Sequence, residues 1–256
     1  MKKYASKSLL IIIILFTGIV VSGIGDVIAQ QPIPRISISI DGAKSPKDVA
    51  VTLEILLLMT VLTLAPAILV LTTSFTRIIV VFHFLRQAMG LQQMPPNQVL
   101  IGLALFLTLF IMNPVYTQVY QNSVKPYLAE EMSFDDAAAS AIKPIREFML
   151  KNTREKDVSL LVSIANINKP SNENDLPTHL LVPAFVISEL RVAFQIGFVI
   201  YMPFLVIDIV VASILMSMGM MMLPPVMISL PFKIMLFVLI DGWYLLVGSV
   251  IKSFVI

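Results

Sequence analysis

The sequence predicts an all-α integral membrane protein whose helices form hairpins. Of its 256 residues, 57% are hydrophobic and 13% are charged, against about 45–50% and about 25% in soluble domains. Mean hydropathy is +0.90, and several apolar runs are long enough to cross a bilayer core of about 30 Å. The net charge of +2 is too small to indicate a nucleic-acid partner. The sequence contains no cysteine, which excludes disulfides and thiol catalysis.

Residues 1–29 have the three-part pattern of a secretory signal peptide. Three early lysines precede an apolar run over residues 9–21 that is too short to span a bilayer, and Val27-Ile28-Ala29 offers a cleavage site. We expect cleavage after Ala29, the alternative being an uncleaved anchor. Residues 30–50 would then form an N-terminal segment on the periplasmic side.

The first predicted membrane hairpin covers residues 51–115. Its two spans are the apolar runs 51–71 and 99–115. The connecting segment, residues 72–98, holds two arginines, one histidine and no acid. Such a bias is typical of a cytoplasmic loop, and we expect a cytoplasmic loop here.

Residues 116–182 form the predicted periplasmic region, because they hold 16 of the 34 charged residues. Ser133 is followed by two aspartates, which is typical of an N-cap and the first turn of a helix. We therefore expect one helix over 134–152 and a second over 154–165. The Asn- and Pro-rich stretch 166–179 predicts a mobile tip.

The second predicted membrane hairpin covers residues 183–256. Its spans are 185–216 and 226–251, joined by a Met-rich loop, residues 216–225. The first of these spans is longer than one perpendicular helix needs. It is expected to extend beyond the bilayer or to break at Pro203.

Five charged residues lie in these apolar spans: Glu189, Arg191, Asp208, Lys233 and Asp241. Asp208 and Lys233 would each cost about 2.5–3.5 kcal/mol at a helix centre, so we expect them to neutralise each other, across the hairpin or between subunits. The pair could be purely structural or could mark a conduction path. Glu189 and Arg191 are two residues apart and do not face each other on a helix. Each is expected to find a partner elsewhere, which indicates a subunit contact.

Five of the seven residues from 216 to 222 are methionine. Gly219 and the pair Pro224-Pro225 argue against one continuous helix here. One interpretation is a hydrophobic turn buried in packed protein. The other is a flexible apolar loop that lines a pore, since methionine is adaptable and an apolar ring blocks ions by dewetting.

Two long segments of the first half resemble signature regions of the FliP family of type III secretion export-gate proteins, which also includes SctR- and SpaP-like members. They run from Ser74 to Gly90 and from Pro95 to Thr108. In the second half, the residues around Glu189, the run from Asp208 to Ser213 and Pro231-Phe232-Lys233 are similar to the family as well. The resemblance covers essentially the whole mature chain.

The resemblance implies a pore-forming, non-enzymatic subunit of the flagellar export gate, without a cofactor. It implies a homopentamer, in contact with membrane lipid, that assembles with FliQ, FliR, FlhB and FlhA. The assembly would pass unfolded flagellar proteins across the bacterial inner membrane, at the flagellar basal body. The cleavable signal favours the flagellar branch of the family.

The resemblance also implies roles for particular residues. Asp208 and Lys233 match buried charged positions important for export, and Glu189 and Phe148 match positions associated with subunit contacts or assembly. The family's pore-closing methionine gasket is matched by three residues: Met220, Met221 and Met222.

Two other functions remain open from the residues alone. A proton-coupled secondary transporter could use Asp208 as its proton carrier. Such a transporter would normally have pseudo-repeated halves with broken helices, and the sequence has no such repeat. A non-conducting assembly scaffold is the third possibility, and it need not line a channel.

Overall fold

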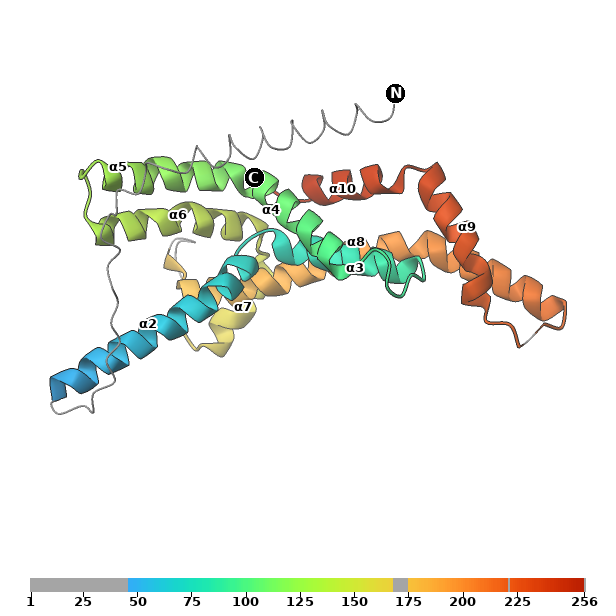
Figure 1. The fold of residues 1–256 in the computed structure, drawn as a ribbon, viewed down its shortest axis with the longest axis horizontal. Helices are drawn as coiled ribbons and strands as arrows, with labels where there is room; N and C mark the ends of the chain where they lie inside the picture. Colours follow the sequence, from blue (N-terminus) through green and yellow to red (C-terminus); the bar gives the residue numbers. More distant parts are fainter. Residues whose placement is uncertain (1–45, 168–174, 221, 256) are drawn as a thin grey trace, which may run out of the picture. The chain divides into compact units, whose positions relative to one another are not determined.

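A computed structural model describes residues 46–167, 175–220 and 222–255, and every regular element in these ranges is helical. The chain divides into two units, residues 1–54 and 55–256. The predicted signal peptide and almost all of the segment 30–50 lie outside the described residues. The helices, shown in Figure 1, are α2 (Pro46–Leu71), α3 (Phe75–Ala88), α4 (Asn97–Val119), the π-helix η1 (Tyr120–Val124), α5 (Lys125–Leu128), α6 (Phe134–Asn152), α7 (Glu155–Ile164), α8 (Thr178–Ser217), α9 (Pro225–Leu239) and α10 (Gly242–Lys252).

The hydrophobic core of residues 55–256 forms around α3, which packs mainly against α8. Ile78, Val81, Phe82 and Leu85 are fully or almost fully buried, and their spacing places them on one face of a helix. The segment 72–98, predicted to be a loop, therefore contains a buried helix. The two arginines and the histidine lower the average hydropathy of this segment. Hydropathy averaged over a window therefore does not detect its apolar face.

Three helical stretches are long and apolar enough to cross a membrane: Ala50–Leu71, Asn97–Leu128 and Thr178–Ser217. The second is longer than the predicted span 99–115. The third is α8, which continues without a break through Pro203. Its 40 residues correspond to a length of about 60 Å at about 1.5 Å per residue.

The fourth predicted span, 226–251, is not one straight helix. It consists of α9 and α10, which are bent by 66° where they meet. Asp241 stands at the bend in the left-handed conformation, with φ 52°. A bent pair of this kind could be one broken span or a re-entrant element, and hydropathy alone does not distinguish it from a straight helix.

The two helices expected between the hairpins are confirmed. α6 covers the predicted range, and the Ser133 hydroxyl accepts a hydrogen bond of 3.2 Å from the backbone N–H of Asp136. α7 begins and ends within one residue of the prediction. Pro144 lies inside α6 without ending it. Part of the predicted tip 166–179 lies outside the described residues, and α8 already begins at Thr178.

Candidate functional site

The Met-rich loop (residues 216–225) connects the end of α8 to the start of α9. Gly219 has φ +74°, a conformation that glycine adopts without the steric cost of a Cβ. Its N–H donates to the carbonyl of Met216, and the N–H of Met220 donates to the carbonyl of Leu215, both at 3.0 Å. These two bonds form a Schellman motif, which ends a helix. The break predicted from Gly219 and the proline pair is confirmed.

The methionine side chains of the Met-rich loop are largely uncovered. Met218 is 65% exposed and Met222 is 98% exposed, while Met220 is half-buried. Met221 lies outside the described residues. In the single chain, therefore, this loop is not the buried turn of the first interpretation. A cluster of exposed apolar side chains usually marks a surface that contacts something else.

Asp208 and Lys233 pair within one chain, across the hairpin formed by α8 and α9. The Lys233 Nζ donates to the Asp208 Oδ2 at 2.6 Å, and Lys233 is 2% exposed. The Ser229 hydroxyl donates to the other carboxylate oxygen. Of the two arrangements expected from the sequence, the structure has the hairpin pair.

Lys233 also reaches a third helix. Its Nζ donates to the carbonyl of Ala88 at 3.1 Å, and Ala88 is the last residue of α3. Carbonyls in the last turn of a helix lack a partner within that helix, and a cation there is favourable. The ammonium group thus connects α3, α8 and α9 near the base of the Met-rich loop.

A second buried ion pair joins Arg77 of α3 to Glu189 of α8. The Arg77 Nε donates to the Glu189 Oε2 at 2.9 Å, and its Nη2 pairs with Oε1. Both side chains are at most 2% exposed. This two-point contact is the strong form of an arginine–carboxylate pair.

The remaining face of the Arg77 guanidinium contacts the C-terminal segment. Its Nη1 donates to the carbonyl of Ser253 at 2.6 Å and to the Ser253 hydroxyl at 2.9 Å. The guanidinium carbon lies 3.8 Å from the centre of the Phe254 ring, which is a cation–π contact. From the sequence, Arg77 is expected only as one of the charges of a cytoplasmic loop. Its position inside the apolar run 75–82 is the signal that could have indicated burial with a carboxylate.

The three residues expected at subunit contacts have different environments. Glu189 has its partner, Arg77, inside the chain, so the sequence argument from a missing partner does not apply to it. Phe148 is 3% exposed and packs against Phe185 and Phe254, with ring centres 5.9 and 6.3 Å away. Arg191 is exposed. A subunit-contact role for each of the three remains a prediction.

Metal-ligating groups do not cluster in the described part of the chain. Across residues 46–167, 175–220 and 222–255, no three His, Asp or Glu side chains lie together in a way that could hold a metal ion. The polar chemistry described above consists of the two ion pairs and their hydrogen-bond partners.

Comparison with known proteins gives consistent matches. A family model described as the FliP family matches residues 58–250. The flagellar biosynthetic protein FliP of Bacillus subtilis (strain 168) is 56% identical over 217 residues, which cover 85% of this chain and 98% of that protein. The protein of the same name from Treponema pallidum (strain Nichols) is 48% identical over 242 residues, covering 93% and 89%. That of Caulobacter vibrioides is 53% identical over 197 residues, covering 77% and 74%.

Proposed function

The chain belongs to the FliP family, and from this premise we propose that it is the pore-forming subunit of a flagellar type III protein export gate. In this proposal several copies surround a channel in the bacterial inner membrane, at the flagellar basal body. Unfolded flagellar proteins pass through the channel. The chain lines the channel and its Met-rich loop closes it, and the chain catalyses no reaction.

The observation that carries the proposal is the exposed Met-rich loop at the tip of the α8–α9 hairpin. Met218 and Met222 present unbranched thioether side chains that are 65% and 98% exposed among the described residues. Copies of such a loop around an axis would form an apolar constriction, and a constriction of this kind blocks ions by dewetting. The same side chains can repack around a passing polypeptide, because methionine adapts to many shapes.

The ion pair below the loop supports the same proposal. Asp208 and Lys233 join the two arms of the hairpin, and Lys233 adds a bond to α3. The Met-rich loop can then change conformation while α8 and α9 keep their positions relative to α3. We propose that the pair holds the base of the loop during substrate passage.

The proposed assembly is a homopentamer that contacts FliQ, FliR, FlhB and FlhA. It requires no nucleotide or other cofactor in this chain, so its partners would supply the energy. Glu189, Arg191 and Phe148 are proposed as contributors to subunit contact, the first and last by fixing the shape of the packed surface from inside.

The experiment replaces Met220, Met221 and Met222 together with alanine in cells that express the gate. Assembly should be unchanged, because Met220 and Met222 lie in the loop between α8 and α9, outside the hydrophobic core. The membrane should leak ions and small solutes, because alanine is too short to close the constriction. Assembly is measured by native electrophoresis of the purified complex, and the leak by dye and ion flux.

The matched control removes three other exposed methionines, Met202, Met227 and Met235, which lie on α8 and α9 outside the loop. This variant should assemble and stay tight. A loop variant that assembles normally and does not leak would contradict the gasket. Leakage of both variants to the same degree would show a general loss of packing instead.

A further inference from the structure

The charged residues within α8 and the bent α9–α10 pair fall into two groups. Three of the five that lie away from the helix ends belong to the two buried ion pairs described above. The other two, Arg191 and Asp241, are exposed. Neither side chain has an ion pair or a hydrogen bond with another residue in the described part of the chain.

An unpaired charge well inside an apolar span is unusual. Such residues almost always face protein or water and pair with a group of opposite charge, whereas a charge at a span end can reach water directly. Arg191 is 13 residues from the start of α8 (191 − 178), and Asp241 is 11 residues from the end of α10 (252 − 241). Each therefore needs a partner, and their signs are opposite.

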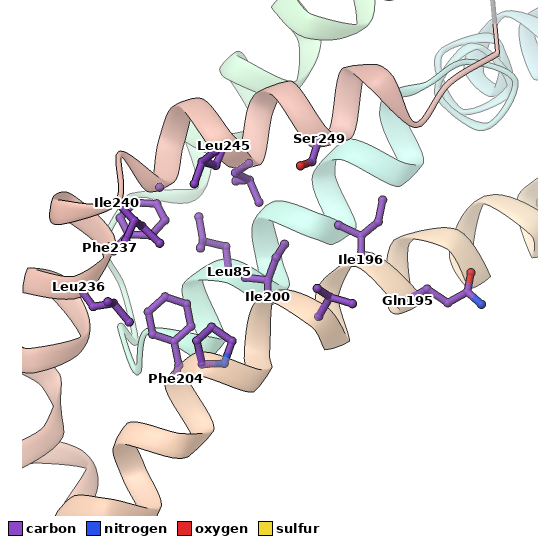
Figure 2. A pocket seen from close by; sticks show the side chains of 14 residues that line it. Leu85, Gln195, Ile196, Ile200, Phe204, Leu236, Phe237, Ile240, Leu245 and Ser249 are labelled. Carbon is purple, nitrogen blue, oxygen red and sulfur yellow. The ribbon is translucent and has the colours of Figure 1, made fainter.

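The two charges lie apart on the surface of one copy. Gln195 is one helical turn after Arg191, and Ile240 directly precedes Asp241. Figure 2 shows Gln195 and Ile240 at opposite ends of the open groove between α8 and α10. Arg191 and Asp241, as neighbours of these residues, lie toward opposite ends of the groove and do not neutralise each other within one chain.

We propose that Arg191 of one copy pairs with Asp241 of a neighbouring copy. The proposal rests on the membrane placement and the several copies of the proposed function, and it names the contact that Arg191 makes there. Each copy carries one cation and one anion at separate places, so head-to-tail contacts around a closed ring neutralise both charges of every copy. Lipid does not serve both groups, because an acyl chain carries no charge and a lipid phosphate repels the Asp241 carboxylate.

Added cysteines test the contact directly, because the chain has none of its own. One copy carries Arg191→Cys and a second, differently tagged copy carries Asp241→Cys, and both are expressed together in cells that make the gate. A short bis-maleimide reagent is used, because an arginine–carboxylate pair holds its Cα atoms farther apart than a disulfide allows. The reagent should link the two copies into a dimer that contains both tags.

The matched control combines Asp241→Cys with Val206→Cys, an exposed position on α8. Val206 is 15 residues after Arg191 (206 − 191), which is about 22 Å along the helix axis. Because this distance exceeds the length of the reagent, the control pair should give no linked dimer.

Exchanging the charges tests the same contact without a reagent. Arg191→Asp and Asp241→Arg should each lower the amount of assembled complex about tenfold, because the contact then joins two like charges. The protein with both exchanges should assemble like the natural one. Since both side chains are exposed, the single variants should keep the helical circular dichroism and melting temperature of the natural chain, which a purely structural role inside the fold would not allow.

Three results would overturn the proposal. One is an assembled gate without the two-tag dimer, and another is a double exchange that assembles as poorly as the single variants. The third is a cysteine at position 191 or 241 that links only to a different kind of subunit. Where a charge variant fails to fold, the cysteine pair decides, because it adds no charge. The methionine leak does not depend on this ion pair, so the two proposals can fail separately.

Discussion

At the scale of single residues, two cations hold together segments that are far apart in sequence. Arg77 connects α3 with α8 and with the segment at Ser253 and Phe254. Lys233 connects α9 with α8 and with the end of α3. Each cation is buried and paired with a carboxylate, Glu189 being fully buried and Asp208 20% exposed. Loss of one partner leaves an uncompensated charge.

Replacing Arg77 with alanine should destabilise the protein strongly. Glu189 would stay buried without a cation, and breaking a buried pair in this way costs about 3–5 kcal/mol. The measurement is thermal unfolding of the detergent-solubilised protein. The control is Arg191→Ala. Arg191 is an exposed arginine on α8, two residues after Glu189, and its replacement should change the free energy of unfolding by no more than about 0.5 kcal/mol.

A second comparison separates loss of the pair from loss of one charge. The double variant Arg77→Leu, Glu189→Leu should be more stable than either single leucine variant, because no charge is left unpaired. If the double variant were as unstable as the sum of the singles, the two residues would not be energetically coupled, and the pair would have no place in the stability of the core.

Exchanging the charges of Asp208 and Lys233 should restore function only in part. Asp208→Ala and Lys233→Ala should each abolish swimming, since each leaves its partner unpaired. The exchanged protein regains the pair, but it places a carboxylate beside the carbonyl of Ala88, which the natural Lys233 ammonium contacts. Swimming in soft agar should therefore lie between that of the single variants and the natural protein. An exchange as inactive as the singles would contradict a functional pairing.

At the scale of the elements, the bend between α9 and α10 is packed around the ring of Phe237. Phe237 packs on Gly242, and its ring also meets the rings of Trp243 and Phe204, at 5.6 and 6.5 Å between centres. These aromatic contacts hold α10 against the core, where Leu246 and Val250 are buried.

Gly242→Ala should open this bend and lower the thermal stability by about 1–3 kcal/mol, the usual range for overpacking. Gly248→Ala is the matched control on α10, since a Cβ there meets nothing within 4 Å. Adding Phe237→Leu to Gly242→Ala should recover part of the loss by freeing the space. A Gly242→Ala protein as stable as Gly248→Ala would mean that the ring moves aside at no cost.

Elements whose signals are local could be predicted from the sequence. α6 was predictable because Ser133 and the two aspartates after it act within one turn, and the end of α8 because Gly219 acts on its own backbone. α3 and the bend at Asp241 could not be predicted, because they depend on contacts across the fold. Glu189, the partner of Arg77, is 112 residues away in the sequence. A hydropathy average over a short window therefore scores Arg77 as an unpaired charge, although Glu189 neutralises it in the fold.

At the scale of the whole molecule, the prediction concerns the side of the membrane on which each loop lies. The chain has no cysteine, so single cysteines can be added without background. Glu131→Cys, between α5 and α6, should react with a membrane-impermeant maleimide added to intact spheroplasts. Gln92→Cys, between α3 and α4, should react only after permeabilisation. Both side chains are exposed, so burial does not bias the comparison. The reverse labelling pattern would show that the chain has the opposite orientation in the membrane.

The length of α8 limits where its two carboxylates can sit with respect to a lipid slab. Glu189 and Asp208 are 19 residues apart (208 − 189) on one continuous helix, which is about 28 Å along its axis. A slab about 30 Å thick has a half-thickness of about 15 Å, so it cannot hold both carboxylates near its midplane. If α8 stands upright and the slab contains both carboxylates, one must lie near each boundary of the slab. At any other position of the slab along α8, at least one of the two ion pairs lies outside the hydrocarbon.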